Sequence, residues 1–502
     1  MSTHKFLQTT TFTTKSPVSG AREKISDLRG KITVLLTGAM LLLAAAPLAA
    51  QESFFDKGEE EGSDSGKGGS LRWSGEIDYT SRMYMDWDWS NLDGDEIARS
   101  PKIAWPELLL EAEYEGEYSK AVGSLEYSAA RPLESGEDLI NEAYFTLYYD
   151  TFDLSAGYMK QVWGTTDGVH VVDRLNPMDY TDFVLPDYRD RNIAEKMVKL
   201  DFYVGDQGKV ELAYVPLFTP HRFSTDPEGR WTPGQLKEMY DTLGITAEEG
   251  KDEYDAFLNT LEEELSDASL GDGQYALRYS DSAGGFDFGA TYYFGFMREP
   301  TAEWGVSEED PNQPVIDSIH FDRMHLFGAE AATVIKGFNM RAEGGYLMTH
   351  DFSGDDNERR NHRIEWVAGF DRNIPLSNLN FQVQTVGSYI MYNDKIEDPD
   401  PATTPQIDPD YDADGDYSSN TVTARLSDSY AHDTIKPEIR GSYNLEKRDF
   451  MIVPELELVL RDDATLNVST AFLGSLVDNK TSGEFEQYED NDFFEMEFGY
   501  SF

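Results

Sequence analysis

One stretch of the sequence, residues 160–194, combines charged side chains that could hold a ligand or move a proton with a short apolar run. An apolar run there, VHVV, leads into an Asp-Arg pair, Asp173 and Arg174, and then into an Asn-Pro break. Carboxylates beside guanidinium groups can form salt bridges, hold a cation or transfer a proton. Because the stretch offers no nucleophile paired with a base, we interpret it as a structured loop and not as a catalytic one.

The candidate site consists of an aromatic anchor and charged side chains from this stretch. They are Trp163, Asp173, Arg174, Asp179, Asp182, Arg189 and Arg191. The apolar side chains between them need burial, and the charges suggest a network of salt bridges. Two hypotheses follow: the loop Gly164–Ala194 folds inward and narrows a channel, or it is a structural brace for the wall of the protein.

No other motif points to catalysis. The chain has 8 His and no Cys, which excludes disulfides, thiolate metal sites and a cysteine nucleophile. It also lacks the motifs of serine hydrolases, zinc proteases and nucleotide-binding loops. We therefore predict that the protein is not an enzyme.

A second acidic stretch, DPDYDADGDYSSN, resembles the start of a calcium-binding loop. Its alternate carboxylates are Asp410, Asp412, Asp414 and Asp416, and such carboxylates can converge on one hard cation. The pattern fails at Thr421, which stands where a bidentate glutamate is required. We predict a solvated acidic loop and no cofactor, with Ca²⁺ as the alternative.

The composition indicates that strands position these residues. Aromatic residues make up 13% of the 502 residues, and Gly numbers 41, a mixture that suits many strands and tight turns. The formal net charge is −52, so nucleic acid, which requires a basic face, is excluded as a partner.

The last strand of the sequence indicates what kind of all-β protein this is. In FFEMEFGYSF, large apolar residues alternate strictly with Glu, Gly and Ser, as in a barrel wall with lipid outside and water inside. The terminal aromatic residues Phe498, Tyr500 and Phe502 resemble the signal by which outer-membrane barrels are recognised for insertion. Beyond the apolar run near the N-terminus, no segment approaches the apolar length of a membrane-spanning helix.

Similar alternating segments occur in pairs from Leu71 onward, joined by tight turns and separated by longer polar stretches. Turns are predicted near Gly116–Ser119, Asp150–Thr151, Gly205–Gly208, Ser282–Gly285, Lys336–Gly337 and Pro375. Short turns alternating with long loops are typical of outer-membrane barrels. We predict a transmembrane antiparallel β-barrel over 71–502, with about 18 strands and 16 as the alternative.

The N-terminal part has the features of a targeting segment. Basic residues precede an apolar run, Ile32–Ala46, and a small-residue cleavage motif ends at Ala50. We predict a signal peptide over residues 1–50 and an acidic, disordered lead over 51–70.

One long loop is expected to contain helices, in an insert over residues 231–270. Thr232 and Pro233 form a helix start, and an apolar stripe follows from Tyr254 to Leu265. Two amphipathic helices outside the barrel must bury their stripes, either as a lid over the pore or as a hairpin packed on itself at the rim.

A family resemblance rests on residues 160–223. The order WG..DG…D.LNP.D…F…D.RD, followed by a hairpin that ends in VPLF.PHR, resembles the domain-of-unknown-function 1302 family. The resemblance implies a porin-like outer-membrane barrel, whose own function is poorly defined. The helical insert and the acidity depart from it, so it implies neither pore size nor substrate.

Three functions remain open at this point. The first is a porin-like channel for small solutes, general or cation-preferring, shaped by the inward-folded loop. The second is a transporter of hydrophobic compounds, similar to fatty-acid channels, with a plugged lumen; the third is a surface adhesin or structural barrel without an open path. In each case we expect location in the outer membrane, with membrane lipid, lipopolysaccharide or an equivalent, and the barrel-assembly machinery as partners.

Overall fold

The structure is a computed structural model. It describes residues 69–85, 105–129, 136–182, 184, 188–224, 229–234, 236–237, 273–306, 314–396, 408–412, 415–477 and 483–502. One compact unit, residues 69–130 and 141–502, contains the functional region, and residues 1–68 and 131–140 form another. The predicted signal peptide and most of the acidic lead therefore lie outside the described residues.

An antiparallel sheet of 18 strands forms the main unit. Its first half consists of β1 (Ser70–Tyr84), β2 (Trp105–Glu115), β3 (Ser119–Ser128), β4 (Ile140–Tyr148), β5 (Phe152–Met159), β6 (Glu195–Val204), β7 (Gly208–Val215), β8 (Gln274–Ala283) and β9 (Phe286–Phe296). Its second half consists of β12 (Arg323–Ile335), β13 (Phe338–Thr349), β14 (Arg363–Asn373), β15 (Asn380–Ile390), β16 (Ser418–Ser427), β17 (Ile435–Asn444), β18 (Asp449–Arg461), β19 (Ala464–Ser475) and β20 (Phe493–Ser501).

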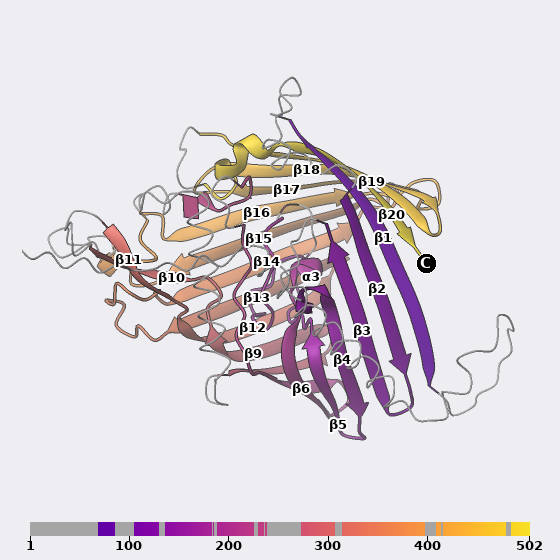
Figure 1. Ribbon diagram of the computed structural model, residues 1–502, viewed down its shortest axis with the longest axis horizontal. Coiled ribbons are helices and arrows are strands. Elements are labelled where there is room, and N and C mark those ends of the chain that lie inside the picture. Colours follow the sequence, from indigo (N-terminus) through magenta and orange to yellow (C-terminus); the bar gives the residue numbers. More distant parts are fainter. Residues whose placement is uncertain are drawn as a thin grey trace, which may run out of the picture. The chain divides into compact units, whose positions relative to one another are not determined.

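The sheet closes on itself, as Figure 1 shows. Neighbours in sequence pair with one another, β9 pairs with β12, and the last strand β20 pairs with the first strand β1. Closure leaves no strand edge without a partner, which a barrel in lipid requires. The predicted all-β barrel with 18 strands is confirmed.

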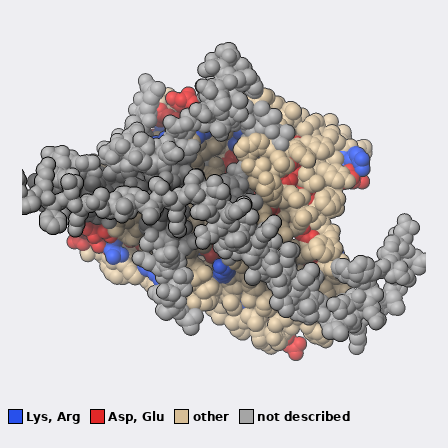
Figure 2. Space-filling model, viewed as in Figure 1, with Lys and Arg blue, Asp and Glu red and all other residues tan. Residues whose placement is uncertain are grey.

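The two faces of the wall differ, as the alternation in the sequence predicts. In β20, Met496, Phe498 and Tyr500 are exposed on the outer face, whereas Glu495 is 5% exposed on the inner face. Successive strand residues point to opposite faces, so this wall is apolar outside and polar inside. Figure 2 shows that the described part of the face in view is largely uncharged, with charged side chains in small groups.

The predicted tight turns join the strands at one end of the barrel. Gly284 and Gly285 connect β8 to β9 with φ of 63° and 81°, and Lys336 and Gly337 connect β12 to β13 with φ of 53° and 80°. Positive φ at both central residues matches the twist of a two-residue hairpin, and glycine adopts it without strain. The opposite end carries the long connections.

One of these long connections differs from the expectation, and another is mostly outside the described residues. The stretch after Arg298, predicted as a loop, contains a separate hairpin of β10 (Thr301–Val306) and β11 (Pro314–His320). The predicted helical insert lies mostly outside the described residues. In the described part of the chain, helices are short: η2 (Glu137–Leu139), α3 (Tyr188–Arg191), α6 (Asn393–Ile396) and η3 (Glu486–Asn491). No helix in the described ranges is long and apolar enough to span a membrane.

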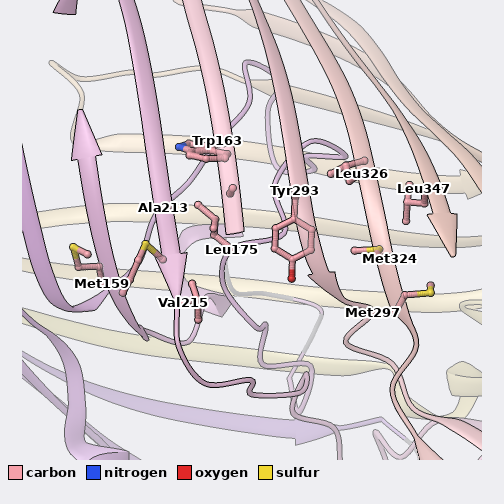
Figure 3. Close-up of a cluster of buried hydrophobic side chains, with 12 residues drawn as sticks. Met159, Trp163, Leu175, Ala213, Val215, Tyr293, Met297, Met324, Leu326 and Leu347 are labelled. Carbon is pink, nitrogen blue, oxygen red and sulfur yellow. The ribbon is translucent and has the colours of Figure 1, made fainter. Parts of the chain in front are cut away.

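A cluster of buried apolar side chains lies on the inner side of the wall, drawn in Figure 3. Strands β6 to β13 supply most of its members, among them Val215, Tyr293 and Leu326. Trp163 and Leu175 come from the connection between β5 and β6, and each is 1% exposed. An inner wall that faced only water would not carry such a cluster, so this connection covers part of the wall from within.

Candidate functional site

The connection between β5 and β6, residues 160–194, folds into the barrel. It carries the short helix α3, which lies within the outline of the strands in Figure 1. Of the apolar side chains predicted to need burial, Trp163, Val171, Val172 and Leu175 are at 4% exposure or less, whereas Val169 is only half-buried. Their burial explains why a loop this long stays ordered instead of extending into solvent.

Glu343, on the inner face of β13, holds the first half of this loop. One oxygen of its carboxylate accepts hydrogen bonds from the Thr165 and Thr166 backbone N–H groups at 2.8 and 2.9 Å and from the Thr166 hydroxyl at 2.6 Å. The His170 ring contacts the same oxygen at 2.9 Å, and the Val171 N–H donates to the other at 3.0 Å. The glutamate side chain is fully buried, so a single carboxylate from a distant strand replaces water as the partner of five loop groups.

Further ion pairs extend this contact along the wall. Arg174 pairs with Glu365 on β14. Asp167 accepts hydrogen bonds from Arg341 on β13 at 2.5 Å and from Gln382 on β15 at 2.8 Å. Strands β6, β7, β8, β9 and β12 separate β5 from β13 in the ring, so the loop contacts a region of wall far from its own root.

The second half of the loop reaches another part of the wall. Asp182 pairs with Arg82 on β1 at 2.7 Å, and Arg82 also donates to Glu495 on β20 at 2.5 Å. Arg82 is 1% exposed, and Phe493 lies 4.0 Å from its guanidinium carbon. The loop is thus attached to β13–β15 and to β1–β20, two regions on different sides of the ring.

Asp173 organises the interior of the loop. Its carboxylate accepts hydrogen bonds from the N–H groups of Trp163 at 3.1 Å and Leu175 at 3.2 Å and from the Tyr188 hydroxyl at 3.3 Å. Burial outweighs these hydrogen bonds and raises the pKa of Asp173 to about 6. The carboxylate braces the turn from inside, where it contacts no open channel directly.

A second connection, between β7 and β8, packs on the first. Arg222 pairs with Asp179 at 3.0 Å, and the two residues form a parallel bridge. The His221 ring accepts the Met178 N–H at 2.8 Å, and burial lowers the pKa of His221 to about 4. A neutral imidazole is therefore part of this contact.

The same connection then reaches the far wall. The Trp231 ring N–H donates to the Tyr84 hydroxyl at 3.0 Å, and its ring packs against Tyr488 and Phe493. Close by in the sequence, the Gly234 N–H donates a hydrogen bond to the side-chain oxygen of Gln487 at 2.6 Å. The start of the predicted helical insert is therefore held against β1, β20 and η3, although its roots at β7 and β8 lie elsewhere in the ring.

The remaining predicted site residues contribute less to these contacts. The Arg189 side chain is 70% exposed and lies 3.7 Å from Glu142. Arg191 is half-buried in α3, and its carbonyl accepts the Asp179 N–H at 2.7 Å. The predicted charges are thus distributed over several separate contacts along the loop, where the sequence suggested one network.

The residues of the predicted calcium loop are engaged in ion pairs. Asp410 is buried and pairs with Arg360 at 3.3 Å and Arg363 at 3.1 Å. Lys447 pairs with Asp412 at 3.1 Å and with Asp416 at 3.4 Å, while Asp414 lies outside the described residues. Among the residues that the structure describes, no group of three or more His, Asp or Glu side chains is placed to hold a metal ion.

Several important partners were not predicted from the sequence: Arg82, Glu343, Glu365, Arg298 and Trp231. Arg298 donates to the Leu175 carbonyl at 2.8 Å and pairs with Glu195 at 3.1 Å. For Arg82, Glu343 and Glu365 the only available signal was a charge on the inward-facing side of a strand, and Arg298 and Trp231 lie outside the strands. Such charges occur on most strands of a barrel, so the pattern cannot identify those that contact a loop.

Inward-facing carboxylates on β6–β8 and β12 are neutralised by neighbouring cations. Lys199 and Lys209 lie 3.2 and 2.9 Å from Glu211, and Arg278 lies 2.7 Å from the same carboxylate. Arg278 also pairs with Glu330 on β12. Pairs of this kind cancel most of the local charge.

Inward-facing carboxylates on β1, β2 and β20 lack such cations. Glu107 accepts a hydrogen bond from Ser128 at 2.6 Å, and Glu497 accepts one from Thr80 at 3.2 Å. Asp78 lies opposite Glu107 in the strand register. No Lys or Arg of the described ranges forms a salt bridge with these three half-buried carboxylates, so this part of the inner wall carries acidic groups without cationic partners.

Three solved structures are similar to this chain, and one of them is described as a BenF-like porin. OccK11 (OpdR) of Pseudomonas aeruginosa is 11% identical, with 86% of this chain and 95% of that chain covered and a TM-score of 0.44. OccAB3 of Acinetobacter baumannii is 8% identical, with 86% and 99% covered and a TM-score of 0.44. A BenF-like porin from Pseudomonas fluorescens is 7% identical, with 86% and 98% covered and the same TM-score.

The family comparison covers most of the chain. The comparison with curated proteins found no match. Residues 111–502 match the family described as "Protein of unknown function (DUF1302)". This span contains every barrel strand except β1 and the beginning of β2, together with the whole inward-folded loop. The chain, an 18-stranded β-barrel, therefore belongs to the DUF1302 family.

Proposed function

We propose that the protein is an outer-membrane channel for small polar solutes, in which loop 164–194 narrows the path. The observation that carries the proposal is the attachment of one loop to two sides of the ring, through Glu343 on β13 and Arg82 on β1. A loop held in this way occupies part of the cross-section, and its position sets the size of the path that remains.

The charge of the inner wall supports a preference for cations. Asp78, Glu107 and Glu497 lie on adjacent strands, and no salt bridge within the described residues neutralises them. A concentrated negative charge in a narrow aqueous path attracts cations and repels anions. The substrate class is therefore small and either neutral or positively charged.

A transporter of hydrophobic compounds is the second candidate, supported by the contacts of Trp231. This residue attaches the connection between β7 and β8 to the far wall, as expected if the predicted helical insert over 231–270 forms a lid and not a hairpin on the rim. A surface adhesin or structural barrel remains the third candidate. Passage through the barrel requires no catalytic group, and we propose no enzymatic activity.

The apolar outer wall supports location in an outer membrane, with membrane lipid, including lipopolysaccharide or an equivalent, in contact with it. We also propose insertion by the barrel-assembly machinery, for which Phe498, Tyr500 and Phe502 supply the terminal aromatic pattern. Phe502 exchanges backbone hydrogen bonds of 2.9 Å with Gly75 at the closing seam. Any of these residues could therefore also serve closure itself.

Conductance of the purified full chain in planar bilayers tests the proposal. We expect steady single channels whose reversal potential in a KCl gradient has the sign of cation selectivity. Silent barrels that bind a fatty-acid-like ligand would favour the hydrophobic transporter. Silent barrels that bind no solute would favour the adhesin or structural barrel.

A further inference from the structure

Two histidines lie close together on the outer face of the barrel, at the end that carries the long connections. His325 is in β12, and His350 directly follows β13. His325 pairs in register with Met348, which places His350 diagonally beside it on the same face. The imidazole centres are 5.8 Å apart, with an angle of 38° between the rings.

The surroundings leave one nitrogen of His325 available. Its Nδ1 lies 2.9 Å from the Tyr292 hydroxyl. When Nδ1 carries the proton and donates it to that oxygen, Nε2 has a lone pair for a ligand, the arrangement that orients histidines in metal sites. His350 is exposed and makes ring contacts with His325 and Phe352, and no hydrogen bond reaches it from the described part of the chain.

The ring separation is close to that of two histidines on one ion. A metal bound at about 2.1 Å places each ring centre roughly 3.2 Å from the ion, so two rings at a tetrahedral angle have centres roughly 5 Å apart. The observed distance between the ring centres is 5.8 Å. A small rotation of the exposed His350 side chain is enough to bring the two rings to the separation that a shared ion requires.

We propose that His325 and His350 form a two-histidine site for a divalent transition-metal ion, of which zinc is the probe. Imidazole nitrogen suits zinc, copper and nickel, whereas calcium and magnesium prefer oxygen. No described set of three His, Asp or Glu side chains surrounds this position, so water or an anion completes the coordination. This site is independent of the proposed channel, because it faces away from the lumen.

Zinc binding by the purified full chain, measured by competition with a chromogenic chelator, tests the proposal. We expect His325→Ala and His350→Ala each to weaken binding at least tenfold, and Tyr292→Phe to weaken it several-fold through the loss of orientation. The matched control is His432→Ala, in the turn between β16 and β17, which should bind zinc as the parent does. Heat-modifiable migration on a gel checks that each variant remains folded.

Two results would overturn the site. One is unchanged zinc affinity in both His325→Ala and His350→Ala. The other is loss of binding in His320→Ala, which would place the ion at hairpin β10–β11, where His320 lies 3.2 Å from Glu303 and 3.4 Å from Asp322. Folded variants that lose binding only at His325 and His350 would support it.

Discussion

Two regions of the inner wall use similar residues for different purposes. On β6–β8 and β12–β14, carboxylates such as Glu211 and Glu343 are covered and matched by cations or by the donors of the inward-folded loop. On β20, β1 and β2, Asp78, Glu107 and Glu497 have no such partner in the described ranges. Both regions have the same alternation of polar and apolar residues in the sequence.

The two regions differ in the groups that surround each carboxylate. A buried carboxylate stabilises the protein only when donors surround it, since its desolvation is costly otherwise. Asp78, Glu107 and Glu497 are half-buried and lie on adjacent strands without cationic partners. The covered wall therefore holds the loop, while the wall of β20, β1 and β2, here called the negative wall, carries acidic groups that no cation of the described ranges matches.

The largest effect is expected from Glu343→Ala, which removes the anchor on the covered wall. The loop groups lose their common acceptor, and we expect a loss of about 3 kcal/mol or more in the free energy that holds the loop in place. Single-channel conductance should rise roughly twofold or more as the loop leaves the path. Glu457→Ala is the control, because Glu457 pairs with Lys436 at 2.7 Å and forms no hydrogen bond or ion pair with the described residues of the loop.

Unchanged conductance in Glu343→Ala, together with faster proteolysis of the loop, would show that the loop moves without lining the path. Unchanged conductance without faster proteolysis would show that Glu343 is not its anchor. Either outcome would contradict the division between the two walls.

The next effect tests the negative wall. The triple variant Asp78→Asn, Glu107→Gln and Glu497→Gln should lower the ratio of cation to anion permeability several-fold, measured from reversal potentials. The control variant is Glu117→Gln, Asp150→Asn and Asp206→Asn. It also replaces three acidic residues, but these lie in the short turns β2–β3, β4–β5 and β6–β7, at the end of the barrel away from the long connections. Equal shifts in the two variants would mean that the total charge of the protein, and not the negative wall, sets selectivity.

The third prediction concerns the pH dependence of local stability around two buried loop residues, Asp173 and His221. The pKa of Asp173 is raised from 3.8 to about 6 in the folded protein. Its contribution to stability is therefore complete below pH 4 and is lost as the pH rises through 6. Asp173→Asn should remove this dependence, on the order of 1–3 kcal/mol, in hydrogen exchange of the neighbouring Leu175 amide.

His221 is expected to give the opposite pH dependence of local stability. Burial lowers its pKa from 6.5 to about 4, so its contribution is present above pH 6.5 and is lost as the pH falls through 4. His221→Gln should flatten the dependence of the Met178 amide over this range. If both amides respond to pH in the same direction in the parent protein, the assignment to these two groups is wrong.

The smallest effect is expected from Arg189→Glu with Arg191→Glu. The sequence alone suggested that these residues face the channel, but the Arg189 side chain is 70% exposed and is only loosely paired with Glu142. A solvated charge of this kind is strongly screened. We expect a shift in reversal potential well below that of the triple variant. A larger shift would place α3 at the narrowest point.

Alternation and turn chemistry predicted most of the fold. The strict pattern of β20 and the paired glycines at Gly284–Gly285 are local signals, so the sequence carries them completely. The hairpin β10–β11 was missed because it lies outside the membrane wall and lacks that alternation. Trp163 and Leu175 were correctly predicted to be buried, because large apolar side chains in an ordered loop need cover.

The contacts that hold the loop could not be predicted in the same way. Glu343 lies 177 positions from Thr166 in the sequence, and Arg82 pairs with Asp182 on a segment that is likewise distant in the sequence. Ring closure decides which strands lie opposite the root of the loop. No local pattern contains that information.

The sequence by itself determined a closed β-barrel wall, because a period of two and tight turns are properties of neighbouring residues. Only the tertiary structure decided which inner carboxylates became anchors and which stayed without a cationic partner in the described ranges. The physical reason is that the state of a carboxylate depends on the donors around it. Those donors come from segments that closure of the barrel brings together.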